Sequence, residues 1–407
     1  MRCRYCQHAV KDIMVDLGMS PLANAFVEPK NFYRSEKFYP LRAMICRKCY
    51  LVQLKEFEVP AKIFGYYYYF SSFSSGWLKH AQTYAEMAIK RFKLSSKSLV
   101  VEIASNDGYL LQYFKKSNIP VLGIEPASNV AQAARKKNIR TLVEFFGLRV
   151  AKKLSAKKLK ADLVVANNVL AHVPNLNDFV AGIHQILKKD GVVTIEVPHL
   201  LQILKHIQFD TIYHEHFSYF SLFTTRKVLS SQGLRIFDVE KLETHGGSLR
   251  IYACHQGSSH PTSARVRRLL KEELTFGLAR LSTYRNFGKK VQRAKQELLG
   301  FLNNVKNRDK TIVAYGAAAK GNTLLNYCGI GPNYLDYVVD RNPHKQGTYL
   351  PGSHLPVLKP EVIKKTKPDY LLILPWNIKK EILRQMAYIR RWGGQFVLAL
   401  PKARVLS

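Results

Sequence analysis

The sequence of 407 residues has no apolar run near the roughly 20 residues that a membrane-spanning helix needs. Its first residues, MRCRYCQHAV, also lack the apolar segment of a secretory signal peptide. We therefore expect a cytoplasmic protein without a membrane partner. The chain is too long for one ordinary hydrophobic core, so two or three domains are expected.

Acidic residues are scarce, because 29 Asp and Glu stand against 63 Lys and Arg, for a net charge of +34. Such an excess favours anionic partners, among them nucleic acid, membrane surfaces and sugar nucleotides. The lysines are spread through RKKNIR, AKKLSAKKLK and IKKEILRQ, which is typical of the solvated faces of several helices. No RNA- or DNA-binding motif accompanies the charge, so nucleic acid is not the expected partner.

Cysteine is also infrequent, but four of the six cysteines form two CxxC pairs, Cys3/Cys6 and Cys46/Cys49. Thiolates at this spacing can converge tetrahedrally on one zinc ion. Four thiolates fill the coordination sphere, so the zinc is expected to be structural and to fold a small module over residues 1–60. A redox-active pair is the alternative.

The segment from residue 98, SLVVEIASNDGYLLQYF, changes from an apolar strand to a small-residue turn and an amphipathic helix. Three further apolar strands follow in VLGIEPA, ADLVVANNVLAHVPN and GVVTIEVP. This alternation predicts a doubly wound α/β domain over residues 61–260, whose ligand binds at the carboxyl ends of the strands.

The first turn of this domain has one glycine, Gly108, where a dinucleotide site would have three. The acids Glu102 and Asp107 would repel a pyrophosphate but suit a cofactor with a positive centre, as in S-adenosylmethionine. Glu125 closes the second strand, where an acidic side chain can hold ribose hydroxyls. These residues favour a methyltransferase over a dehydrogenase.

Apolar residues at steps of three and four predict a long helix over 287–305, within a linker of residues 261–306. A second α/β unit is expected over 307–407, beginning with KTIVAYGAAAKGNTLLNY. Gly316 and Gly321 lie at its first strand-to-helix turn, beside Lys320. They either let backbone amides receive a phosphate or permit close packing of strand and helix, and the sequence leaves both open.

The stretch TIYHEHFSYFS, residues 211–221, gathers two histidines, a glutamate and two tyrosines. Histidine titrates near neutral pH and a carboxylate can orient it, so the cluster is a candidate proton-handling site. A hydrogen-bonded structural pair is the alternative for any one histidine and glutamate.

These motifs together resemble the three-domain C-methyltransferases that branch deoxysugars attached to a nucleotide. The resemblance rests on the paired CxxC, VVEIASNDGYLLQYF, GIEPA, NNVLAHVPN, YHEHFSYFS, HGGSLRIY, YGAAAKGNTLLNY and PWN. It implies a zinc module, a central S-adenosylmethionine domain and a carboxyl-terminal Rossmann-like domain around a nucleotide sugar. Carbon 3 of a dTDP-linked 4-keto-6-deoxy sugar is the favoured acceptor, with carbon 5 as the alternative. We expect a monomer.

In such an enzyme a base removes the proton beside the ketone and the resulting enolate attacks the sulfonium methyl. The resemblance implies His216 as base, oriented by Glu215, with Tyr213 and His172 donating to the enolate oxygen. Either of these two residues could instead be the base, with His216 as the donor. Tyr67, or Tyr69 if the register shifts, is expected near the cofactor or sugar.

The remaining expected site residues divide into two groups. The cofactor group surrounds the methionine end and the ribose, and comprises Glu102, Ala104, Asn106, Asp107, Gly108, Glu125, Pro126 and Asn167. The group expected to bind the nucleotide sugar comprises Lys320, Asn322, Trp376 and His245. Ala104 departs from the methyltransferase motif, which has glycine there. Two alternative functions remain open: a methyltransferase acting on RNA, and a zinc protein that binds nucleic acid without catalysis.

Overall fold

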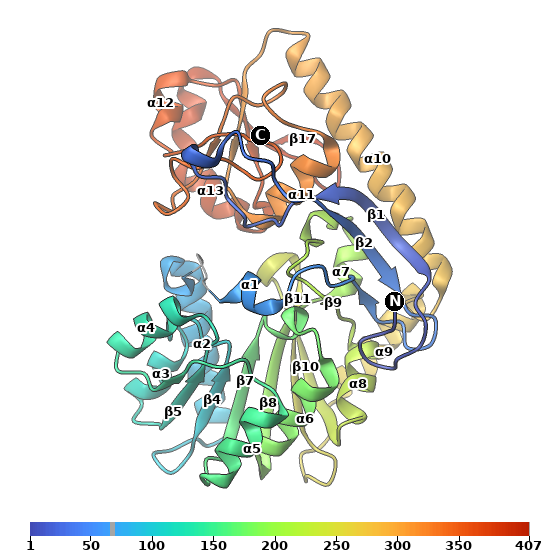
Figure 1. Cartoon of the computed structure of the whole chain (residues 1–407), viewed down its shortest axis with the longest axis vertical. Helices are drawn as coiled ribbons and strands as arrows, with labels where there is room; N and C mark the ends of the chain where they lie inside the picture. The colour runs from blue at the N-terminus through green and yellow to red at the C-terminus, as the bar shows by residue number, and fades with distance from the viewer. Residues whose placement is uncertain (66–69, 407) are drawn as a thin grey trace.

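The computed structural model describes residues 1–65 and 70–406, which are organised around β-sheets in two α/β units and a smaller amino-terminal module. Figure 1 shows the two α/β units one above the other, with the β1–β2 hairpin and the long helix α10 beside them. The expected α/β fold class is confirmed. The division at residues 60, 260 and 306 stays a prediction.

The amino-terminal module is built on an antiparallel sheet of strand order β1-β2-β3-β9. Its elements are β1 (Asp12–Ser20), η1 (Pro29–Asn31), β2 (Tyr39–Ile45), β3 (Val52–Gln53) and α1 (Pro60–Phe64). The last strand, β9 (Ser218–Tyr219), comes from the central unit, and Val52 pairs with Tyr219. The zinc module is therefore continuous with the segment that carries His216.

The central unit contains a sheet of order β10-β11-β8-β7-β4-β5-β6. Strands β4 to β8 are parallel to one another. Strand β11 pairs antiparallel with β8, and β10 pairs antiparallel with β11. The strands are β4 (Val100–Ile103), β5 (Val121–Ile124), β6 (Thr141–Leu142), β7 (Ala161–Asn167), β8 (Leu187–Pro198), β10 (Leu234–Leu242) and β11 (Ser248–His255). All four residues of β4 are buried, as expected of a strand covered on both faces.

Helices cover both faces of the central sheet. The helical segments of the central unit are η2 (Ser71–Phe73), α2 (Ser75–Arg91), α3 (Leu111–Lys116), α4 (Ser128–Lys136), α5 (Leu148–Ala156), η3 (Leu170–His172), α6 (Leu176–Ile186), α7 (Leu200–Lys205), η4 (Phe209–Thr211), α8 (Leu222–Ser230) and η5 (Thr244–Gly246). Their apolar residues recur at helical spacing, as in α5, where Val150, Ala151 and Leu154 are buried.

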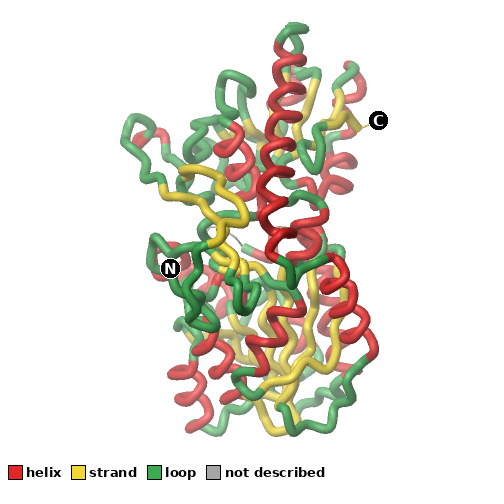
Figure 2. The backbone as a smooth tube through the Cα atoms, turned by 90° about the vertical axis from the view of Figure 1, so that its right-hand side faces the viewer, coloured by secondary structure: helices red, strands yellow, loops and turns green. Residues whose placement is uncertain are grey.

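Two helices connect the α/β units, α9 (Ala264–Phe276) and α10 (Leu281–Lys306). Every apolar position that predicts the helix over 287–305 is buried. Figures 1 and 2 show α10 as a straight rod along the flank of the molecule. Its apolar face shares one core with β1, α7 and the first strand of the carboxyl-terminal unit. The helix thus fixes the upper unit relative to the hairpin and the central unit.

The carboxyl-terminal unit has a sheet of order β14-β13-β12-β15-β16-β17, with only the last pair antiparallel. Its elements are β12 (Ile312–Tyr315), α11 (Ala319–Cys328), β13 (Val338–Val339), β14 (Val357–Leu358), α12 (Val362–Thr366), β15 (Tyr370–Ile373), η6 (Trp376–Ile378), α13 (Lys379–Gln385), η7 (Ala387–Trp392), β16 (Gln395–Leu398) and β17 (Arg404–Leu406). The expected second α/β unit is confirmed.

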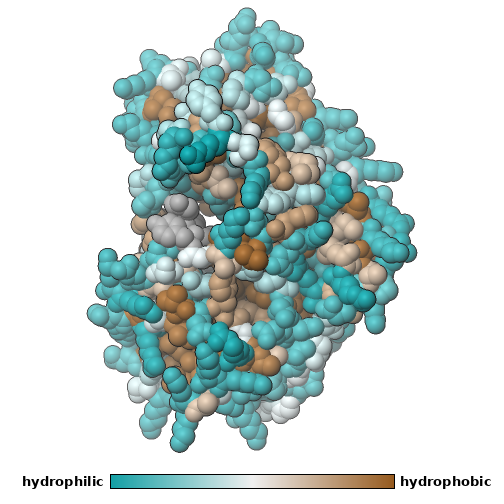
Figure 3. Space-filling view, in the orientation of Figure 1, coloured by the Kyte–Doolittle hydropathy of each residue, from teal (hydrophilic) through white to brown (hydrophobic). Residues whose placement is uncertain are grey.

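The face of the molecule seen in Figure 3 is mostly hydrophilic and is hollowed between the two α/β units. Within the described ranges, no helix combines the length and apolar character required to cross a membrane. The two cysteines outside the CxxC pairs, Cys254 and Cys328, are buried among apolar residues.

Candidate active site

The turn after β4 has an unusual backbone, because Ala104, Asn106 and Gly108 all have positive φ angles of 57°, 48° and 75°. The turn is held against β5 by the Ala104 N–H, which donates to the carbonyl oxygen of Ile124 at 2.7 Å. Ala104 therefore adopts the conformation that glycine favours, which explains the glycine in the usual methyltransferase motif. The alanine is accommodated in this backbone at a modest cost in strain.

Gly108 is the position in this turn where a side chain is least tolerated. A Cβ atom there would lie 2.4 Å from Cδ1 of Ile139, in addition to the strain of its positive φ. We expect Gly108→Ala to lower the free energy of unfolding by about 1–3 kcal/mol. The matched variant Ala104→Gly should change it by less than about 1 kcal/mol, because relief of strain is offset by unfolded-chain entropy. Urea unfolding of both variants tests this, and equal effects would contradict it.

Glu125 lies directly after β5 and its carboxylate organises the neighbouring turn. Its Oε2 accepts the Asn106 N–H and its Oε1 accepts the Ala127 N–H, both at 2.9 Å. Burial raises the pKa of Glu125, and the two amides oppose that shift. Each oxygen retains a second lone pair, which is available for ribose hydroxyls. Pro126 lies between Glu125 and Ala127 and restricts the backbone of this turn.

Two more carboxylates lie beside Glu125, on Glu102 at β4 and on Asp107. Burial raises the pKa of Glu102 well above its ordinary value, and the charges of Glu125 and Asp107 raise it further. In the described part of the chain, Oε2 of Glu102, Oδ1 of Asp107 and Oδ1 of Asn167 are buried without a hydrogen-bond partner. These unpaired acceptors at the carboxyl ends of β4 and β7 fit a cationic ligand with donor groups, as S-adenosylmethionine is.

We expect Glu125→Ala to weaken S-adenosylmethionine binding by about tenfold or more, the effect of losing charge-assisted hydrogen bonds. The substitution also deprives the Asn106 and Ala127 amides of their acceptor, so Glu125→Gln is the matched control that keeps one carbonyl oxygen. Calorimetric titration with the cofactor, beside thermal melting of the free proteins, separates the two effects. Unchanged affinity in both variants would place the ribose elsewhere.

His216 is buried and is anchored in a defined tautomer. Its Nδ1 lies 3.0 Å from the carbonyl oxygen of Thr211, so Nδ1 is the protonated nitrogen and Nε2 carries a lone pair. Burial lowers the pKa of His216 well below its ordinary value, and the neighbouring His172 adds to that shift. A neutral imidazole with an unbonded Nε2 is the form that can accept a proton.

His172, at the end of η3, is a second imidazole beside the base. Its ring centroid lies 4.8 Å from that of His216. Its Nδ1 donates to the carbonyl oxygen of Glu215 at 2.8 Å, and burial lowers its pKa to about 4. The expected donation from His172 to an enolate oxygen stays a prediction, and in this tautomer only a protonated ring could supply that hydrogen bond. The Nδ1 proton of His172 is bonded to the Glu215 carbonyl oxygen, so Nε2 of the neutral ring is a hydrogen-bond acceptor.

Glu215 does not orient His216, contrary to the sequence-based expectation. Its side chain points to the amino-terminal module, where both carboxylate oxygens accept from Nδ2 of Asn24 at 2.7 and 2.9 Å. Burial raises the pKa of Glu215 to about 7, and the charge of Lys345 opposes that shift. The residue therefore joins the module to the loop of His216 and His172.

Tyr213 lies against His216, with ring centroids 4.1 Å apart and planes tilted by 34°. The predicted neighbourhood of these two residues is thus present. Tyr67 and its alternative Tyr69 lie outside the described residues, so their expected place near the cofactor or sugar stays a prediction.

Two of the residues expected to bind the nucleotide sugar, both in the upper unit, cluster with an acid of the central unit that was not predicted from the sequence. Lys320 Nζ lies 4.5 Å from the Trp376 ring centroid and donates to Oδ1 of Asn377 at 2.8 Å. The Trp376 indole donates to Oδ2 of Asp210 at 2.6 Å. Asp210 directly precedes TIYHEHFSYFS, and its place in that run of polar groups was the available signal.

His245 also reaches this region. It has a positive φ of 53°, and burial, followed by the charge of Lys320, lowers its pKa to about 4. Its ring lies 5.3 Å from Trp77 on α2. Asn322, in contrast, donates to the Ala23 carbonyl at 2.5 Å and so joins the upper unit to the amino-terminal module.

The glycines of the second strand-to-helix turn serve packing. A Cβ at Gly316 would lie 2.4 Å from Pro375, and one at Gly321 would lie 2.9 Å from Leu374. The Gly316 N–H is bonded to the Val339 carbonyl, and the Ala317 N–H to Asp340. The close-packing interpretation is the one that these contacts support.

A second buried ion-pair network lies beside the cofactor turn. It was not predicted from the sequence either. Glu196 of β8 is fully buried, with His80 Nε2 at 3.0 Å and Arg250 NH2 at 2.6 Å. A glutamate inside the apolar run GVVTIEVP was the sequence signal. Since an unpaired carboxylate there would be costly, His80 and Arg250 fix α2 and β11 to this strand.

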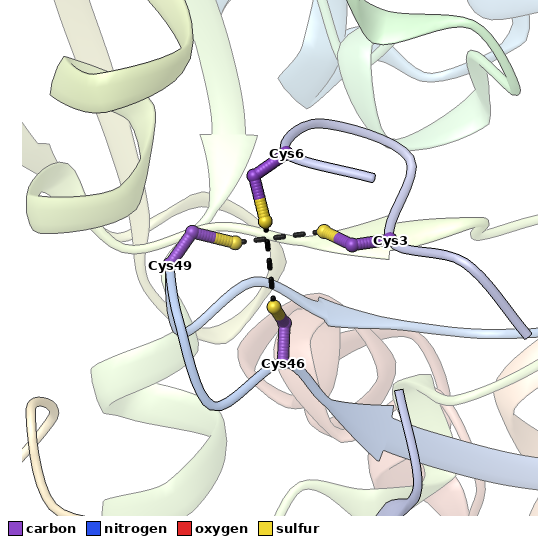
Figure 4. A group of neighbouring side chains, drawn as sticks. All are labelled: Cys3, Cys6, Cys46 and Cys49. Carbon is purple, nitrogen blue, oxygen red and sulfur yellow. Dashed lines mark hydrogen bonds between the residues drawn. The ribbon is translucent and has the colours of Figure 1, made fainter. Parts of the chain in front are cut away.

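The four cysteines of the CxxC pairs converge, as Figure 4 shows, from the amino-terminal loop and the turn after β2. Their Sγ atoms all lie within 4.8 Å of one another, and the Cys3–Cys49 and Cys6–Cys46 separations are 3.5 and 3.6 Å. A tetrahedral zinc with Zn–S bonds near 2.3 Å requires separations of about 3.8 Å. The cluster therefore fits the predicted zinc ion.

Three protein-family models match the chain: a putative zinc binding domain over residues 3–64, a methyltransferase domain over 77–239 and a C-methyltransferase C-terminal domain over 243–401. The C-methyltransferase NovU of Streptomyces niveus is 34% identical over 405 residues, which cover 100% of this chain and 96% of NovU.

Among solved structures, the magnesium protoporphyrin IX methyltransferase of Synechocystis PCC 6803 with bound S-adenosylmethionine is 14% identical, with a TM-score of 0.34 over 44% of this chain and 79% of its own. The YcgJ protein of Bacillus subtilis is 12% identical, with a TM-score of 0.36 over 44% and 100%. The family models and NovU confirm the zinc and S-adenosylmethionine domains and the enzyme class expected from the sequence. The chain belongs to the C-methyltransferase family.

Proposed function

We propose that this C-methyltransferase methylates carbon 3 of a 4-keto-6-deoxy sugar carried on a nucleotide, with dTDP as the carrier. The observation that carries the proposal is the tautomer of His216, whose Nε2 lone pair is free because Nδ1 donates to Thr211. Methylation at carbon requires a carbanion, and a buried neutral base beside a ketone is the means to form one.

His216 would remove the hydrogen on the carbon next to the ketone, so that the electron pair of the C–H bond moves into the enolate. The imidazolium formed keeps its Nδ1 hydrogen bond to Thr211, which stabilises the positive ring. S-adenosylmethionine, when bound, supplies the methyl group as a sulfonium electrophile. Glu125 and the β4 turn would hold it so that the new C–C bond forms as the S–C bond breaks.

The nucleotide part of the proposal is supported by the resemblance in the sequence and by the excess of positive charge. Two lysines of the upper unit, Lys320 and Lys345, could supply positive charge for it. Burial lowers the pKa of both, and this shift is opposed by Asp210 at Lys320 and by Asp340 and then Glu215 at Lys345. We also propose that the enzyme acts in the cytoplasm as a monomer.

The deciding experiment incubates the purified protein with S-adenosylmethionine and a panel of dTDP-4-keto-6-deoxy sugars, followed by mass spectrometry. A product heavier by one methylene supports the proposal, and NMR of the product locates the new methyl on carbon 3 or carbon 5. If calorimetry shows cofactor binding but no sugar is methylated, the proposal fails and RNA becomes the next acceptor to test, because the net charge of +34 favours it.

A further inference from the structure

The proposed reaction requires a donor for the ketone oxygen, because negative charge collects there as the proton leaves. The two histidines cannot serve as neutral rings, since the protons on Nδ1 of His172 and His216 are both used on backbone carbonyls. We propose that Lys320, which lies over Trp376 while Trp376 donates to Asp210, is the cation that stabilises the enolate oxygen. This inference rests on the proposed function and gives Lys320 a catalytic rather than a phosphate-binding role.

The first support is the way α11 packs on the loop that carries the base. Lys320 and Thr323 are one turn apart and share a face of the helix. The Thr323 hydroxyl donates to the Ile212 carbonyl at 3.1 Å, so this face lies on the segment between Asp210 and His216. The Lys320 ammonium is thereby brought to the central unit although it belongs to the upper one.

The second support is the environment of the ammonium group. Lys320 is flanked by the Trp376 ring and by Asn377, and the Trp376 indole in turn donates to Asp210. Of its three N–H donors, one is bonded to Asn377, and no other described residue accepts a hydrogen bond from it. The ammonium therefore has donors available for a carbonyl oxygen of the substrate.

The third support is Asp210, which is fully buried and whose carboxylate is only partly satisfied by hydrogen bonds. Its Oδ2 accepts from Trp376, while its Oδ1 has no partner in the described part of the chain. An unpaired buried carboxylate is costly, and Lys320 is the positive group that offsets it. Asp210 also precedes Thr211, whose carbonyl anchors His216, so one short segment positions both base and cation.

The charge of Lys320 also influences the histidines of the site. Its positive charge contributes to lowering the pKa of His216 in the base loop and of His245 in η5. Burial lowers the pKa of Lys320 itself, and the Asp210 carboxylate in η4 raises it. With this carboxylate ionised the lysine stays charged, and in a site of low dielectric such a cation strongly stabilises a developing oxyanion.

The test measures deuterium uptake beside the ketone in D2O, with S-adenosylhomocysteine in place of the methyl donor so that no methyl transfer occurs. We expect Lys320→Met to lower the exchange rate about a hundredfold, the effect of losing an oxyanion-stabilising group, while KM for the sugar nucleotide changes less than about threefold. A raised KM with normal exchange would show a phosphate-binding role instead. Loss of exchange in Tyr213→Phe but not in Lys320→Met would also overturn the inference.

Asp210→Asn provides a second variant that retains an acceptor for Trp376. Without the carboxylate the pKa of Lys320 is lower, so the alkaline limb of the exchange-rate profile should move to lower pH. An unchanged profile contradicts the inference even if Lys320→Met fails to fold. If the wild-type enzyme shows no exchange with any 4-keto sugar, the proposed function fails first and this inference falls with it.

Discussion

Replacing His216 with asparagine is expected to lower deuterium exchange beside the ketone, and the turnover that depends on it, by about 10²–10⁴-fold. Asparagine keeps an N–H that can reach the Thr211 carbonyl, as Nδ1 of His216 does at 3.0 Å, but it has no basic nitrogen. The loop should therefore keep its structure while losing its proton acceptor. Calorimetry should show S-adenosylmethionine affinity within about threefold of wild type, because His216 is not among the cofactor residues.

His172→Asn is the matched control, because His172 has the same tautomer and the same kind of backbone anchor. Its ring contacts that of His216, so a smaller loss through displaced packing is expected. If His172→Asn abolishes exchange and His216→Asn leaves it near wild type, His172 must be the base in place of His216. If both variants exchange normally, the base lies elsewhere in the hollow.

The parts of the enzyme that could be predicted from sequence are those governed by local periodicity or by fixed spacing. The apolar positions of α10 follow the helical period, and each one is buried. The strand that ends at Ile103 and the spacing within each CxxC pair could be predicted for the same reason, because residues close together in the sequence determine them. Such patterns locate the cofactor turn and the metal centre within a few residues.

The contacts that assemble the site could not be predicted in this way, because they join segments distant in sequence. Glu215 bonds to Asn24, 191 positions earlier, and Asp210 to Trp376, 166 positions later. A glutamate next to a histidine in the sequence suggested a pair, but the turn directs the two side chains to different units. Only the packing of three units against one loop determines which group each side chain meets.

One consequence of that packing is a direct connection between the metal centre and the base. Nε2 of Gln53 donates to Cys3 Sγ at 3.3 Å, and Gln53 pairs with Ser218 across β3 and β9. Ser218 lies two residues after His216. The strand β3, which holds one zinc ligand in place, is therefore paired with β9, the strand on which the catalytic loop ends. Loss of the metal should for this reason disturb the position of the base.

Cys46→Ser is accordingly expected to lower both stability and activity. Serine is a poor zinc ligand, and a structural zinc contributes folding energy directly, so the free energy of unfolding should fall by about 4 kcal/mol or more. Metal analysis should find much less than one zinc per chain, and thermal melting should shift down. Because β3 pairs with β9, deuterium exchange beside the ketone should also fall, even at temperatures where the central unit remains folded.

Cys254→Ala is the matched control, since Cys254 is equally buried but lies in β11 away from the metal. It should keep one zinc per chain and wild-type exchange, with only the small cost of removing a buried sulfur. If Cys46→Ser retained full zinc, the four-thiolate centre would be wrong. If it lost zinc but exchanged at the wild-type rate, the module would stabilise the chain without holding the base, because the pairing of Gln53 with Ser218 would then survive without metal.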